Sequence, residues 1–112
     1  MDMGASLLEF HVLLALASGA LHGYAIAERV AADSGGTLLP RAGSLYRVIA
    51  RLISEGLVAE SGGEVEVPHP GLARRYYALT ASGRRTLGDE ARRLKQAAAA
   101  AEKRLGLARG RS

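Results

Sequence analysis

The sequence predicts a mainly α-helical domain with one small β-hairpin, followed by a long C-terminal helix. Apolar residues recur at helical spacing in the first 55 residues and again after residue 80, which indicates amphipathic helices. Between these two regions the composition favours strands, and turn-forming residues interrupt it. A chain of 112 residues suffices for a single hydrophobic core.

Three helices are expected in the first half. Residues 7–17 are apolar on nearly all sides and predict a buried first helix. Residues 23–33 carry an apolar stripe and predict a second, which the glycines of residues 34–36 end. Residues 37–39 are too short for a helix and predict a brief strand. A third helix is expected over residues 41–55.

The second half predicts a hairpin and a fourth helix. Residues 57–61 and 73–79 have β-type composition, and the glycines and prolines between them predict a long loop, a candidate wing. Thr80 suits the N-cap of a helix running from residue 81 to about residue 107. At 1.5 Å per residue this helix would be about 40 Å long, more than so small a domain covers with its own core.

Apolar residues on the last helix repeat at alternating intervals of four and three, the pattern of a coiled-coil seam. Such a stripe needs a partner, so we expect a homodimer; a solvent-exposed amphipathic helix is the alternative. The predicted organisation is therefore a domain over residues 1–80 and a dimerisation helix with a short tail over residues 81–112. The expected dimerisation residues are Leu87, Ala91, Leu94, Ala98, Ala101 and Leu105.

The composition of the chain excludes several kinds of site and favours one class of partner. The chain lacks cysteine, which removes disulfides and thiolate sites. No apolar stretch is long enough to span a bilayer and the first residues do not resemble a secretory signal, so we expect a cytoplasmic protein that does not bind membranes. Residues 1–40 carry one basic and four acidic residues, whereas residues 41–112 carry fourteen and seven. This asymmetry favours a polyanionic partner, most often nucleic acid, with membrane phosphate as the minor alternative.

The predicted order of helices and hairpin is that of a winged helix-turn-helix domain, in which the third helix enters the major groove of double-stranded DNA. One face of this helix is apolar, and the opposite stripe contains Ser44, Arg47, Arg51 and Ser54. Arginine can donate two hydrogen bonds to guanine, and serine can bond a base or a phosphate. A merely solvated helix face is the alternative.

Further candidate DNA-binding residues flank this stripe. Arg74 and Arg75 lie on the returning strand of the hairpin, on the side expected for the third helix. Tyr46 suits either a phosphate contact or the edge of the core. Arg41 begins the third helix, where it can approach a phosphate although it is a poor N-cap.

The sequence offers no catalytic, cofactor or metal site, so we do not expect an enzyme. His11, His22 and His69 lack metal-ligand spacing, and Ser44 has no nucleophile-elbow pattern around it. Phosphate-binding and dinucleotide-binding glycine motifs are absent from the sequence as well. The competing function is a protein-interaction module without DNA binding; a membrane-surface role for the basic last helix lacks the lipophilic face it would need.

Several short motifs, in order, resemble the PadR family of transcriptional regulators over residues 7–95. They are His22-Gly23-Tyr24, Pro40 with Gly43-Ser44-Leu45-Tyr46, Leu52 with Glu55-Gly56-Leu57, and Arg75-Tyr76-Tyr77-Ala78-Leu79-Thr80 with Gly83-Arg84.

The resemblance implies a dimeric winged helix repressor that places each third helix in one major groove of a palindromic operator. Many members of the family respond to a small aromatic or hydrophobic ligand, so a small-molecule effector is expected. The family's recognition positions correspond to Ser44, Tyr46, Arg47 and Arg51, and its basic wing strand to Arg74 and Arg75.

This chain departs from the family pattern in three respects. Arg41-Ala42 replaces the Ser-Pro that often begins the third helix, and Glu64 and Glu66 in the wing would repel phosphate. The chain has no tryptophan, so relatives that hold planar drugs between tryptophans offer no model for its ligand.

Overall fold

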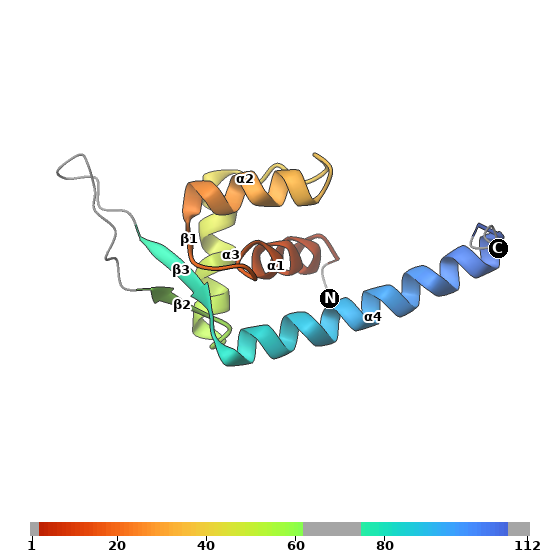
Figure 1. Ribbon diagram of the computed structural model, residues 1–112. Coiled ribbons are helices and arrows are strands. Elements are labelled where there is room, and N and C mark those ends of the chain that lie inside the picture. Colours follow the sequence, from red (N-terminus) through yellow and green to blue (C-terminus); the bar gives the residue numbers. More distant parts are fainter. Residues whose placement is uncertain (1–2, 62–74, 108–112) are drawn as a thin grey trace.

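The computed structural model describes residues 3–61 and 75–107, with side chains described from residue 7 onward (Figure 1). Within these residues the mainly helical fold with a small sheet is confirmed. The elements are α1 (Met3–Ala15), β1 (Leu21–His22), α2 (Gly23–Asp33), α3 (Ala42–Ser54), β2 (Val58–Ser61), β3 (Tyr76–Leu79) and α4 (Ala81–Leu105).

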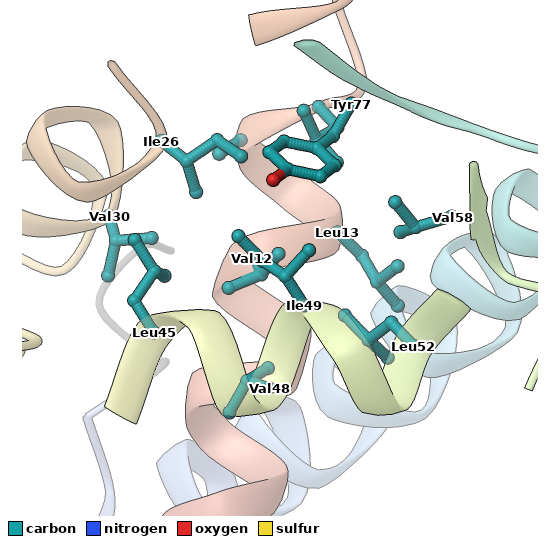
Figure 2. Close-up of a cluster of buried hydrophobic side chains, with 12 residues drawn as sticks. Val12, Leu13, Ile26, Val30, Leu45, Val48, Ile49, Leu52, Val58 and Tyr77 are labelled. Atoms are coloured by element: carbon teal, nitrogen blue, oxygen red, sulfur yellow. The ribbon is translucent and has the colours of Figure 1, made fainter. Parts of the chain in front are cut away.

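The core lies where α1, α2 and α3 meet the sheet (Figure 2). Each helix contributes aliphatic side chains at helical spacing, and the sheet closes one end of the cluster. Burying one such side chain stabilises the fold by about 1.5 to 3 kcal/mol, so the core fixes α3 against both neighbouring helices. The largest fully buried side chains are Val12, Leu16, Ile26, Val30, Leu45, Ile49, Leu52 and Val58.

The sheet is antiparallel, in the order β1-β3-β2. Leu79 of β3 is opposite Val58 of β2, and Tyr77 of β3 is opposite Leu21 of β1. The hairpin expected from the sequence is thus confirmed in its described part. Residues 62–74, which include Arg74, the expected wing loop and the expected start of the returning strand, lie outside the described residues.

The prediction of a brief strand at residues 37–39 is wrong. These residues lie in the α2–α3 loop, where the Leu38 amide donates to Ser34 Oγ at 3.0 Å and the Thr37 hydroxyl donates to the Ser34 carbonyl at 2.8 Å. Because the Leu38 amide is bonded to the Ser34 side chain, it cannot donate a hydrogen bond to a neighbouring strand. The short strand is instead β1, whose two residues are too few to produce a period in the sequence.

The helix bounds agree closely with expectation, except that α1 begins four residues early and ends at Ala15. The bounds of α2 are those expected, and α3 is one residue shorter at each end. Thr80 caps α4, which runs for 25 residues to Leu105 and is ended by Gly106 in the left-handed conformation. Only its first half lies beside the rest of the molecule, and the second half projects away (Figure 1).

Across residues 3–61 and 75–107, no helix has the length and hydrophobicity that crossing a membrane requires.

Candidate nucleic-acid interface

The third helix, α3, buries one face and presents the other to solvent. Leu45, Val48, Ile49 and Leu52 point into the core (Figure 2), while Arg47 and Ala50 on the opposite face are exposed. Ile53 recurs at the same helical spacing as the buried residues, but it lies at the margin of the buried face and is exposed. The exposed face is therefore broader than the apolar spacing of the helix alone indicates.

Two arginines near the start of α3 are available for an anionic partner. Arg41 is the N-cap residue, but its side chain makes no capping hydrogen bond. Arg47 runs back toward the N-terminus of α3, since a β-carbon placed on Gly43 would lie 4.0 Å from Arg47 Nη1. Both are exposed, and within the described residues neither forms an ion pair.

The second half of the predicted stripe is engaged with the protein itself. Arg51 Nη2 lies 2.9 Å from Glu9 Oε2 of α1, and the Arg51 side chain is about half exposed. The Ser54 hydroxyl donates to the Arg51 carbonyl at 2.8 Å, so it bonds its own helix. Ser44, at the other end, is partly buried beside Leu38 and Pro40. The stripe therefore divides into a free N-terminal half and a C-terminal half tied to α1.

Arg75 directly precedes β3, and its guanidinium donates to Glu60 of β2 at 3.2 Å. The pair is largely exposed, so it is worth about 0 to 1 kcal/mol and leaves Arg75 able to exchange Glu60 for a phosphate. Arg74 cannot be placed, because it lies outside the described residues.

Tyr46 lies against the start of α2. A β-carbon on Gly23 would be 2.0 Å from the Tyr46 hydroxyl oxygen, so a larger residue at position 23 would force the Tyr46 ring to shift. Nearly half of the Tyr46 side chain is exposed. The ring thus packs at the edge of the core while its outer part remains open to a partner.

The sequence reasoning assigned no role to Tyr24, an exposed residue in the first turn of α2. His22 caps this helix, because its Nδ1 accepts a hydrogen bond from the Ala25 amide at 3.2 Å. The Tyr24 ring stacks on the His22 ring, which meets Tyr76 edge to face. The signal was present in the His-Gly-Tyr motif, but only the fold places this aromatic cluster at the same end of the molecule as Tyr46.

Tyr77 of β3 is buried in the core. Burial raises the pKa of its hydroxyl above 10.0, and nearby Tyr46 and Glu60 raise it further, while Arg75 acts in the opposite direction. The Tyr77 hydroxyl therefore stays protonated at neutral pH.

A compact joint connects α3 to α4. The Thr80 hydroxyl accepts from the Gly83 amide at 2.9 Å and donates to the Gly56 carbonyl at 2.6 Å. Gly83 approaches the backbone just before β2 so closely that a β-carbon there would lie 2.0 Å from the Leu57 carbonyl oxygen. Arg84 also donates to the Ala17 carbonyl at the end of α1, at 3.2 Å. The direction of α4 is thus set by contacts with the turn that ends α3.

The predicted seam of α4 is largely uncovered. Leu87 packs partly against the core, whereas Leu94 is 41% and Leu105 is 70% exposed. Ala91, Ala98 and Ala101 are exposed too. Leu7 on α1 is 43% exposed, so the first helix is less buried than its composition predicted.

The positive charge is concentrated in the C-terminal segment rather than near α3. Residues 1–80 carry six basic and eight acidic side chains, a net charge of −2, whereas residues 81–112 carry nine and three, a net charge of +6. The asymmetry that favoured a polyanionic partner therefore comes mainly from residues after 80.

Three packed helices, a described hairpin and a solvent-facing third helix define a winged helix-turn-helix protein. The model of the transcriptional regulator PadR-like family matches residues 12–89, and the chain belongs to this family. The resemblance noted in the sequence is therefore confirmed. A comparison with curated proteins gave no match.

Solved structures of similar fold agree with the family assignment. A PadR-like transcription factor from Bacteroides fragilis is 25% identical, with a TM-score of 0.74 over 90% of this chain and 92% of that one. Bacillus subtilis PadR in complex with operator DNA is 25% identical, with a TM-score of 0.64 over 74% of this chain. The same protein with p-coumaric acid is 22% identical, with a TM-score of 0.59 over 80% of this chain. The matches cover only 45% and 44% of the two Bacillus chains.

Proposed function

We propose that this chain is a homodimeric repressor that binds a palindromic operator in the cytoplasm. In this proposal each α3 enters one major groove, and half-sites lie about 34 Å apart, one turn of DNA. Residues 1–80 form the DNA-binding domain, and residues 81–112 form the dimerisation segment. The observation that carries the proposal is the exposed outer face of α3, with Arg47 unpaired among the described residues, in a fold shared with a relative solved on operator DNA.

The candidate residues divide by expected role. Arg47, with Ser44 beside it on the helix, is the best placed to read a base edge. Arg41 and Tyr46 flank the start of α3 and suit phosphate contacts. Arg51 and Arg75 would have to leave Glu9 and Glu60 to contact DNA, and they contribute less.

The charge distribution predicts a shallow salt dependence. If Arg41 is the only basic residue of each subunit that neutralises a phosphate, a dimer releases about two counterions, and the log-log slope of affinity against salt is about −1.8. If Arg51 and Arg75 join it, about six contacts give a slope of about −5. Salt titration therefore reports whether the two intramolecular pairs open on DNA.

A protein-interaction module is the second candidate function. One observation favours it. Residues 1–80 carry a net charge of −2, whereas electrostatic attraction to the phosphates of DNA needs positive charge. A module of this kind would show no affinity for duplex of any sequence at low ionic strength.

The proposed effector is a small apolar molecule. A cavity of about 300 Å³ lies between α1, the end of α3 and α4, with Phe10, Leu13 and Leu52 in its lining. Glu9, Glu55, Glu90 and Arg93 also line it. Glu9 and Glu90 are paired with Arg51 and Arg93, so the carboxylate of Glu55 is the uncompensated charge, and a neutral or cationic ligand suits the cavity better than an aromatic acid. Calorimetric titration with p-coumaric acid and with its uncharged amide tests this, and tighter binding of the acid would contradict it.

The decisive experiment is selection of bound sequences from random duplex DNA by the purified chain. We expect a palindromic consensus, with repression of a reporter that carries it. In Arg47→Ala, affinity for this site should fall by about 1 to 3 kcal/mol with relaxed base preference, if Arg47 reads a guanine. Lys103→Ala on the far part of α4 is the control of equal charge change and should leave base preference unaltered. The absence of any selected sequence would refute the proposal.

A further inference from the structure

We infer that Glu9 of α1 holds Arg51 of α3 away from DNA, and that an organic cation in the cavity beside Glu9 releases it. This inference rests on the proposed function and adds to it the charge of the effector and the direction of its effect. The effector acts as a corepressor, because its binding frees a guanidinium for contact with DNA.

The Glu9 carboxylate is shared by an ion pair and a cavity. Its Oε2 lies 2.9 Å from Arg51 Nη2. Glu9 also lines the cavity of about 300 Å³ whose apolar lining includes Phe10, Leu13 and Leu52. Helix α1 contacts both α3 and α4 (Figure 1), so this cavity lies where the three helices meet. A ligand that fills it therefore lies next to the residue that pairs with Arg51.

Arg51 is suited to leave this pair for DNA. It lies one helical turn after Arg47, so the two side chains share the outward side of α3. The Arg51 side chain is 48% exposed, and an ion pair this exposed changes an equilibrium by no more than about fivefold. A competing cation can therefore open the pair, and the long side chain of Arg51 can then turn to a phosphate.

The charges around the cavity favour a cation as the competitor. Glu55 lies one turn after Arg51 on α3 and forms no ion pair among the described residues. Glu90 lines the cavity from α4 but is paired with Arg93 of its own helix. Glu55 thus attracts a cation into the cavity, where the cation competes with Arg51 for Glu9. Arg51 regains water when it leaves, so the exchange strands no buried charge.

Glu9→Gln imitates the released state without a ligand, because it removes the charge that holds Arg51. We expect affinity for the selected operator to rise by up to about fivefold per subunit, or about 25-fold for a dimer. The log-log slope against salt should become steeper by about 1.8, since two arginines join the phosphate contacts. Glu102→Gln, an equal charge change at an exposed position on the far part of α4, is the control and should alter neither.

A double-mutant cycle shows whether Arg51 carries the effect. In an Arg51→Gln background, Glu9→Gln should leave DNA affinity unchanged, because no arginine remains to be released. An equal gain in both backgrounds would overturn the inference, since it would report net charge alone. Urea unfolding followed by circular dichroism checks that each variant is folded. Titration with small molecules requires only the unmodified chain, so it tests the inference even if a variant fails to fold.

Phenethylamine and 2-phenylethanol are matched probes for the cavity, because they share a ring and a two-carbon chain and only the amine is charged at neutral pH. Phenethylamine should bind the unmodified chain in calorimetry, raise its affinity for the operator and steepen the salt slope. It should have no effect on DNA binding by Glu9→Gln, and 2-phenylethanol should have none on either protein.

Three results of this titration would overturn the inference. They are a failure of phenethylamine to bind, a fall in DNA affinity when it binds, and an equal effect of the two probes on DNA affinity. A chain that binds no duplex of any sequence would instead remove the proposed function. The two failures are thus distinguishable.

Discussion

Replacing Gly83 with alanine tests the joint between α3 and α4. The added β-carbon would lie 2.0 Å from the Leu57 carbonyl oxygen and 3.2 Å from a methyl carbon of Leu79. The first of these contacts is with backbone, so the start of α4 or the start of the hairpin must move. Forced overpacking of this kind costs about 1 to 3 kcal/mol.

Gly83→Ala also stabilises α4 by removing a glycine from a helix, and this stabilisation offsets part of the overpacking cost. Alanine is favoured over glycine inside a helix by about 1 kcal/mol. Gly88 lies in the same helix, and a β-carbon there would meet only the tip of Arg92, at 3.8 Å. Gly88→Ala should therefore raise the free energy of unfolding by up to about 1 kcal/mol, while Gly83→Ala should lower it by up to about 2 kcal/mol.

Urea unfolding followed by circular dichroism, at one protein concentration for all variants, measures both changes. We expect midpoints that move in opposite directions with unchanged slopes. If Gly83→Ala were as stable as Gly88→Ala, the close approach of α4 to Leu57 would be refuted, and with it the reason for glycine at this position.

Further predictions concern the cap, the core, the seam and one ion pair. Thr80→Val should lose about 1 to 2 kcal/mol of stability, because the amide of residue 83 and the carbonyl of residue 56 lose their partner; an unchanged unfolding midpoint would contradict the cap. The raised pKa of Tyr77 means that its contribution to stability is present below pH 10.0 and is lost as pH rises through its folded pKa, so Tyr77→Phe should flatten the alkaline decline seen in unfolding titrations. Leu94→Asp should give a monomer in sedimentation, since it places a charge in the proposed seam. Glu9→Gln should cost less than about 1 kcal/mol in urea unfolding, as the pair with Arg51 is partly exposed, and a larger loss would show that the pair anchors α3.

The sequence predicted the helices well because their evidence is periodic. Residues 23–33 and 41–55 carry clear apolar stripes, and both helices form within one residue of expectation. The cap at Thr80 and the stop at residues 34–36 were predictable from local chemistry alone. The strand β1 was not, because it exists only through its pairing with Tyr76 and Tyr77.

The candidate site was less predictable, because its electrostatics depend on contacts between distant parts of the chain. Glu9 and Arg51 are 42 positions apart, and only the packing of α1 on α3 reveals that they form a pair. The helical pattern alone presented Arg47 and Arg51 as equivalent. The structure separates them, since Arg47 is unpaired among the described residues and Arg51 is held by α1.

The Thr80 hydroxyl fixes the orientation of the long helix α4 relative to the turn that follows α3. Its two hydrogen bonds attach the turn that follows α3 and the first turn of α4 to the same atom. With 25 residues in α4, a rotation of about 5° at this pivot displaces the far end of the helix by about 3 Å. Without the Thr80 hydroxyl the turn after α3 and the start of α4 would lose their shared hydrogen-bond partner, whereas with it the direction of α4 is tied to that turn.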